Sequence, residues 1–145
     1  MQISVKILCK MSSLMDQLIS QLVLESEIVP AADVAFKKKQ QENQKSNLLA
    51  KAESSNLQQS YLHYYDATLR SIELILLSYG YCLGIHPHLV MKKLFNEIDS
   101  KVNINYLVNA RHSIKKQNTF PTLRDIEMII EAHQSATVYV SREYI

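Results

Sequence analysis

Four charged or titratable side chains lie close together in one short stretch of the sequence, NARHSIKK. They are Arg111, His112, Lys115 and Lys116. Arginine presents a planar fork of donors that fits a phosphate, lysine presents a compact positive charge, and histidine titrates near neutral pH. His112 and Lys116 are four residues apart, so they share one face of a helix. This combination predicts a site that binds phosphate groups.

Arg111 also lies on the apolar side of the helix that is predicted over residues 102–117. A buried charge without compensation costs several kcal/mol, so Arg111 must face a carboxylate or line a groove. Glu73, at the flank of the apolar stripe of another helix, is the first candidate partner, and Asp66 is the second. Two interpretations remain open: a structural ion pair that fixes the register of two helices, or an arginine that binds phosphate. The apolar positions around Arg111 are Ile104, Leu107, Val108 and Ile114.

The other histidines and the lysine run predict packing or solvent exposure. His86 and His88 flank Pro87, but no nearby cysteine or carboxylate completes a metal site, so both are interpreted as helix-start residues in a turn. His133 is interpreted as a partly buried packing residue, and residues 37–39 as a solvated helix face. The sequence has no glycine-rich phosphate loop, and neither a metal nor a cofactor is predicted.

The elements that must position these residues are predicted to be helices. The 145 residues include only two glycines and three prolines, which argues against a fold of many strands and turns. Gly80 and Gly84 are expected to end the long helix over residues 57–81 in a left-handed conformation. We therefore predict an all-α, up-and-down helical bundle. At least five helices are predicted, and the helical spacing of apolar residues places them over residues 13–27, 57–81, 88–98, 102–117 and from residue 122 to about 140.

A single domain is predicted over residues 13–145. A chain of this length buries enough surface to fold without a disulfide framework. Residues 1–12, where polar and apolar side chains alternate, are interpreted as an N-terminal arm or extension. Residues 31–56 are polar and are interpreted either as an exposed helix that packs along one narrow edge or as a partly mobile segment.

The overall charge and the cysteines bear on the class of protein. The net charge of +2 is too small for a dedicated binder of duplex DNA, so any role with nucleic acid must rest on a local patch. Two cysteines make neither a disulfide framework nor a zinc site. No apolar run approaches about 18 residues, and the first ten residues lack the pattern of a signal peptide. The expected location is the cytoplasm, with no contact with a membrane.

Two segments of the sequence together resemble the HEPN superfamily. In that family, a helix of this Leu/Arg/Glu pattern ends in a Gly-Tyr turn and precedes a helix whose motif opens with an arginine and a polar residue. Arg111 and His112 match this opening. The likeness covers roughly residues 60–141 and implies a HEPN-like core over about 57–143. The segments are HYYDATLRSIELILLSYGYCLGIHPHLVMKKL and NYLVNARHSIKKQNTFPTLRDIEMIIEAHQSA.

The chain departs from the family where the motif should close with a histidine. Lys116, Gln117 and Asn118 occupy those positions. In members that cleave RNA, an arginine and a histidine from each of two protomers meet at a dimer groove, and no metal is required. For this chain the resemblance implies a homodimer that binds RNA or a nucleotide at such a groove, in a bacterial or phage toxin–antitoxin or defence system. It assigns the catalytic positions to Arg111 and His112, but a lysine is a poor general acid or base at neutral pH, which argues against cleavage.

The alternative belongs to a different class of function. In it, the chain is a non-enzymatic helical interaction or immunity module with a cognate protein partner. The pairing of Arg111 with Glu73 is then purely structural.

Overall fold

The structure is a computed structural model, which describes residues 13–53 and 55–143. The described residues are mostly helical and contain one sheet of two short strands, so the all-α prediction is confirmed. The predicted N-terminal arm, residues 1–12, lies outside the described residues. None of the described helices combines the length and the apolar character needed to span a membrane. The elements are α2 (Ser13–Leu24), β1 (Ile28–Pro30), α3 (Val34–Glu53), α4 (Leu57–Ser78), β2 (Tyr81–Leu83), α5 (Pro87–Ile98), α6 (Ile104–Gln117) and α7 (Leu123–Glu143).

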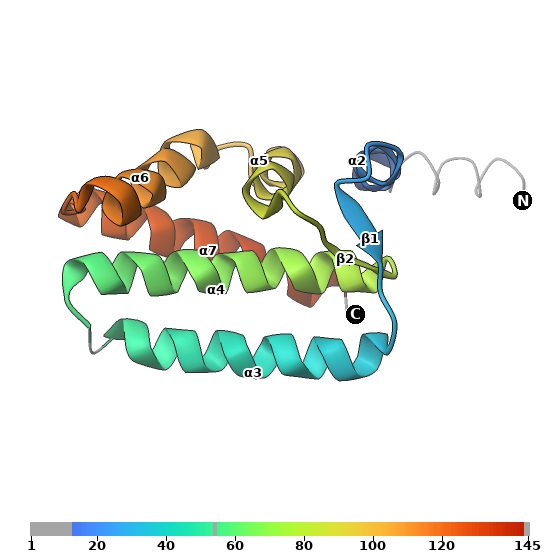
Figure 1. The fold of residues 1–145 in the computed structure, drawn as a ribbon, viewed down its shortest axis with the longest axis horizontal. Coiled ribbons are helices and arrows are strands. Elements are labelled where there is room, and N and C mark those ends of the chain that lie inside the picture. The colour runs from blue at the N-terminus through green and yellow to red at the C-terminus, as the bar shows by residue number, and fades with distance from the viewer. Residues whose placement is uncertain (1–12, 54, 144–145) are drawn as a thin grey trace, which may run out of the picture.

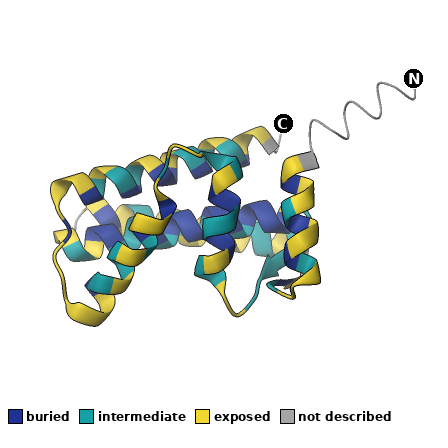
Figure 2. Ribbon diagram, turned by 90° about the horizontal axis from the view of Figure 1, so that it is seen from above, coloured by how far each residue is buried: buried dark blue, intermediate teal, exposed yellow. Residues whose placement is uncertain are grey.

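Helix α4 is the centre of the molecule (Figure 1). Asn56 begins it by accepting a hydrogen bond from the backbone N–H of Gln59, at 2.9 Å. Its apolar residues extend around most of the helix, which is typical of a helix buried on several sides. Figure 2 shows the buried residues concentrated along this helix, and the exposed ones on the elements around it.

Helix α3 packs antiparallel to α4 although it is strongly polar (Figure 1). Of its 20 residues only Gln41 and Ala52 are buried. The Gln41 amide oxygen accepts a hydrogen bond from Arg70 of α4 at 3.0 Å, and Lys45 donates to the Thr137 hydroxyl of α7 at 2.7 Å. Residues 34–53 therefore form the helix that packs along one edge, rather than a mobile segment.

The directions of the helices differ from a simple up-and-down bundle. Helices α3, α4 and α7 run lengthwise, whereas α2 and α5 are seen nearly end-on in Figure 1. Helix α7 also runs in the same direction as α4 because α5 and α6 intervene between them (Figure 1). The predicted alternation of helix direction is found for α3 and α4. The other helices surround the central helix α4 on several sides and do not continue the up-and-down pattern.

The sheet was not predicted. Strands β1 and β2 pair antiparallel, with Val29 opposite Cys82. Gly80 has a positive φ of 87° just after α4, as expected for a glycine that ends a helix. The expectation for Gly84 was wrong: a Cβ at this position would lie 2.6 Å from the Glu27 carbonyl oxygen, so glycine is required by the close approach of the two chain segments.

Candidate anion-binding site

Arg111 extends from α6 toward the central helix. Its neighbours Leu107 and Ile114 are buried, which fixes the inward face of α6. The guanidinium carbon of Arg111 lies 5.2 Å from the centre of the Tyr65 ring of α4, a distance typical of a cation–π contact. Tyr61, one turn earlier on α4, donates a hydrogen bond to the Leu107 carbonyl at 2.7 Å and so ties the two helices together.

The predicted ion pair of Arg111 is absent from the described residues, and this expectation was wrong. Glu73 instead accepts a hydrogen bond from the backbone N–H of Leu83, at 2.9 Å, and so anchors β2. Glu73 follows Tyr65 by eight residues, which places it about 12 Å further along α4, beyond the reach of Arg111. Asp66 is half-buried, but it forms no salt bridge with Arg111 either.

The Nε atom of Arg111 is the one buried side-chain nitrogen or oxygen without a hydrogen-bond partner among the described residues. A buried donor that lacks an acceptor costs about 1–3 kcal/mol. An unpaired buried group in a folded protein calls for a physical explanation, and a ligand that supplies the acceptor is one such explanation.

His88 is the residue of this site that sequence reasoning missed. It lies in the first turn of α5, and its Nδ1 atom is 2.8 Å from the Tyr65 hydroxyl. His88 precedes the buried Met91 by three positions and Phe95 by seven, so it continues the inward stripe of α5. That spacing was the only signal in the sequence, because the contact with Tyr65 spans 23 positions.

The surroundings of His88 are mostly positive. Burial lowers the pKa of His88, and the charges of Arg111, Lys115 and Lys92 lower it further, while Asp66 opposes them. Burial also raises the pKa of the Tyr65 hydroxyl. At neutral pH the site therefore holds a neutral imidazole, a neutral phenol and a fixed positive charge, a combination that attracts an anion.

The four residues predicted from the sequence do not all meet. Arg111 is half-buried, and Lys115, one turn further along α6, is close enough to affect His88. His112 and Lys116 are exposed on the outer surface of the helix, because each successive residue turns by about 100°. The site within one protomer thus consists of Arg111 and Lys115 with His88, whereas His112 and Lys116 form the outer ridge of α6.

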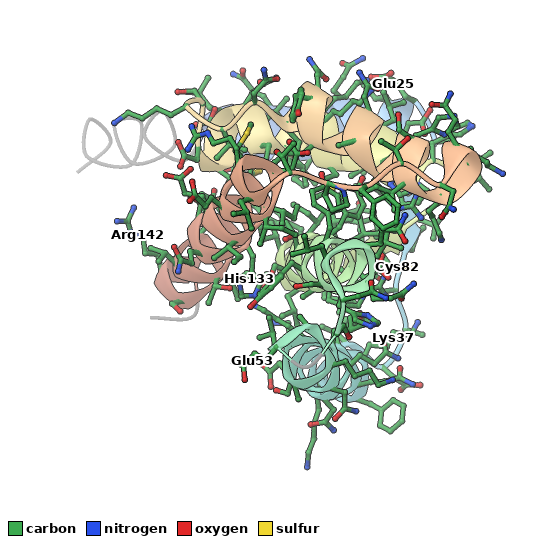
Figure 3. The ribbon with its side chains drawn as sticks, turned by 90° about the vertical axis from the view of Figure 1, so that its left-hand side faces the viewer. Glu25, Lys37, Glu53, Cys82, His133 and Arg142 are labelled. Carbon is green, nitrogen blue, oxygen red and sulfur yellow. The ribbon has the colours of Figure 1, made fainter. Side chains whose placement is uncertain are left out.

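The remaining histidines lie elsewhere. His133 is buried as predicted, and it contacts the Thr137 hydroxyl and the Tyr64 ring. Figure 3 shows it on the side of α7 that faces α3 and α4. His86 lies 3.0 Å from a carboxylate oxygen of Glu27. The described residues contain no group of three or more His, Cys, Asp and Glu side chains that could hold a metal ion.

The chemistry open to this site is the recognition of an anion with several oxygens. Arg111 supplies an unpaired donor together with its charge, and Lys115 and Lys92 add charge nearby. A phosphate group matches these donors well. In comparisons with known proteins, no family model, no curated protein and no solved structure matches this chain.

Proposed function

We propose that this protein binds the phosphate groups of RNA or of a nucleotide through Arg111. The observation that carries the proposal is the Nε atom of Arg111, which is buried beside Tyr65 without an acceptor and without a carboxylate. The fold holds a positive charge here that no described carboxylate pairs with in a salt bridge. A phosphate group at the guanidinium would neutralise the charge, and a small movement of the half-buried Arg111 side chain on binding would bring its buried Nε–H to a phosphate oxygen.

The resemblance to the HEPN superfamily supports RNA as the source of the phosphate. The residues that carry the resemblance lie at a helix end and on a later helix: Gly80 follows α4, which ends at Ser78, and α6 carries Arg111 and His112. We propose a HEPN-like core over about residues 57–143 and a role in a bacterial or phage toxin–antitoxin or defence system. The proposed activity is binding rather than cleavage, because Lys116, Gln117 and Asn118 leave the motif without its closing histidine.

The second candidate function is a non-enzymatic protein-interaction module. It is favoured by an apolar groove of about 540 Å³ between α2 and the end of α4, lined mainly by Ile19, Val23, Leu24, Tyr79 and Tyr81. Leu24 is 80% exposed at this groove. Replacing Arg111 would not change the affinity for a protein partner at this groove. An Arg111 variant therefore distinguishes the two functions.

The test is a comparison of RNA affinities for two arginine variants. Arg111→Ala should weaken binding of a single-stranded RNA oligonucleotide at least tenfold, because a hydrogen bond to a charged group contributes about 1.5–3 kcal/mol. Arg124→Ala removes an arginine of the same charge that lies exposed on α7 and should change the affinity little. Equal affinities of the wild type and both variants, measured by fluorescence anisotropy, would contradict the proposal.

A further inference from the structure

A second cavity lies on the opposite flank of α6 from Arg111. It has a volume of about 230 Å³ and opens between α6 and the loop that leads into α7. Its lining combines two aromatic rings, Tyr106 and Phe120, with polar side chains, namely those of Asn109, Ser113, Thr119 and Asp125. Flat apolar rings beside hydrogen-bonding groups are what an unpaired nucleobase requires.

The loop that forms this cavity is held in place by hydrogen bonds. The Gln58 amide of α4 donates to the carbonyl oxygens of Asn118 and Thr119, at 3.2 and 3.0 Å. Thr122 and Asp125 cap α7 reciprocally, since the backbone N–H of each donates to the side chain of the other. The Tyr106 hydroxyl donates to Asp125 at 2.5 Å and so joins α6 to the same cap.

Phe120 remains in water on this fixed loop. Its exposed fraction is 71%, although Pro121 beside it is buried. Exposed aromatic rings at defined positions are the stacking platforms of proteins that bind single-stranded nucleic acids.

The cavity and the Arg111 site are joined by a basic ridge. On α6, Arg111 and Lys115 lie on one flank, and Tyr106 with Ser113 lies on the other. His112 and Lys116 are exposed on the outer surface between these flanks. A helix is about 10–12 Å across with its side chains, a distance that a few nucleotides span.

We infer that the cavity takes one unpaired nucleobase of an RNA strand whose backbone crosses α6 toward Arg111. The base stacks on Phe120 and Tyr106, and its polar edge hydrogen-bonds to Asn109 and Ser113. This inference rests on the proposed function and extends it from the phosphates to the bases. The positive ridge favours RNA over a protein segment as the occupant, because the backbone of RNA carries one negative charge per nucleotide.

The experiment separates the recognition of bases from the recognition of phosphate. The two probes are a single-stranded oligoribonucleotide and inorganic polyphosphate, which carries repeating negative charge without bases. Phe120→Ala should weaken binding of the oligonucleotide about tenfold, in line with the loss of one stacked base, and leave the affinity for polyphosphate unchanged. Leu123→Ala is the matched control, because Leu123 is 70% exposed on the next turn of the chain but does not line the cavity.

The variants also distinguish failure of this inference from failure of the proposed function. Equal RNA affinities for Phe120→Ala and Leu123→Ala would overturn the base pocket, and so would an equal loss of RNA and polyphosphate binding in Phe120→Ala. Arg111→Ala should weaken the binding of both probes. If it weakens neither, the phosphate site itself is wrong, and the base pocket falls with it.

Discussion

Part of the Arg111 guanidinium is removed from water, because its Nε atom is buried. The contact with the Tyr65 ring offsets part of that cost, since a cation–π interaction contributes about 0.5–2 kcal/mol. The unpaired Nε atom and the neighbouring charge of Lys115 act in the opposite direction. This balance is expected of a binding residue, which is retained for its ligand rather than for the stability of the fold.

Replacing Arg111 by methionine should therefore separate stability from binding. Methionine fills the space of the arginine stem and removes the unpaired donor, so the free energy of unfolding should rise by about 1 kcal/mol. RNA binding should be lost in the same variant. Urea denaturation measures the first quantity, and a decrease of more than about 2 kcal/mol would show that Arg111 supports the fold.

Glu73 positions the two-stranded sheet rather than Arg111. Glu73→Ala should lower the free energy of unfolding by about 1–2 kcal/mol, because the backbone N–H of Leu83 loses its acceptor. Glu73→Gln should cost much less, since its amide oxygen can still accept. Breaking a buried ion pair would cost about 3–5 kcal/mol. If Glu73→Ala lowers the free energy of unfolding by that much, and Arg111→Met relieves the loss, then Glu73 and Arg111 form an ion pair after all.

The packing of α3 and α7 around His133 should make stability depend on pH. Burial lowers the pKa of His133 to about 4, with a further contribution from Lys45. The unfolded chain binds this proton near pH 6.5 and the folded chain near 4. The free energy of unfolding is therefore undiminished by His133 above about pH 6.5 and falls by about 2–3 kcal/mol toward pH 4.

Two histidine variants test this pH dependence, one on α7 and a control on α6. His133→Gln should flatten the decrease between pH 6.5 and 4, whereas His112→Gln, at an exposed position, should leave it as in the wild type. Thermal unfolding measured across this range supplies the comparison. An unchanged decrease in His133→Gln would assign the acid sensitivity to other groups.

Local signals in the sequence predicted the helices but not the contacts between them. Asn56 and Thr122 mark the starts of α4 and α7 by hydrogen bonds to residues three positions away, so both starts could be read from the sequence. The strands are only three residues long, and β1 pairs with residues more than 50 positions away, which no local pattern reveals. Contacts between distant residues also decide the site. For this reason the sequence did not reveal that His88 contacts Tyr65, or that Glu73 binds the backbone of Leu83 and not Arg111.

We propose that two copies of the chain form a two-fold dimer through the outer surface of α6. Such a dimer repeats one patch, so His112 and Lys116 of both copies would converge, and the charges of the two lysines would repel each other. RNA or phosphate between the copies should therefore stabilise the dimer, and added salt should weaken RNA binding as counterions are released. Sedimentation at micromolar concentration tests this, and a monomer both with and without RNA would contradict it.

In the proposed complex, a phosphate oxygen becomes the acceptor of the unpaired Arg111 donor. The most direct measurement is the Nε–H resonance of Arg111 in a proton–nitrogen NMR spectrum, assigned by its disappearance in Arg111→Lys. Titration with a single-stranded RNA oligonucleotide should move this resonance downfield in proportion to the bound fraction, while the Nε–H resonance of the exposed Arg124 stays in place. Saturated RNA binding with an unmoved Arg111 resonance, or no RNA binding at all, would show that Arg111 does not donate to a phosphate of RNA.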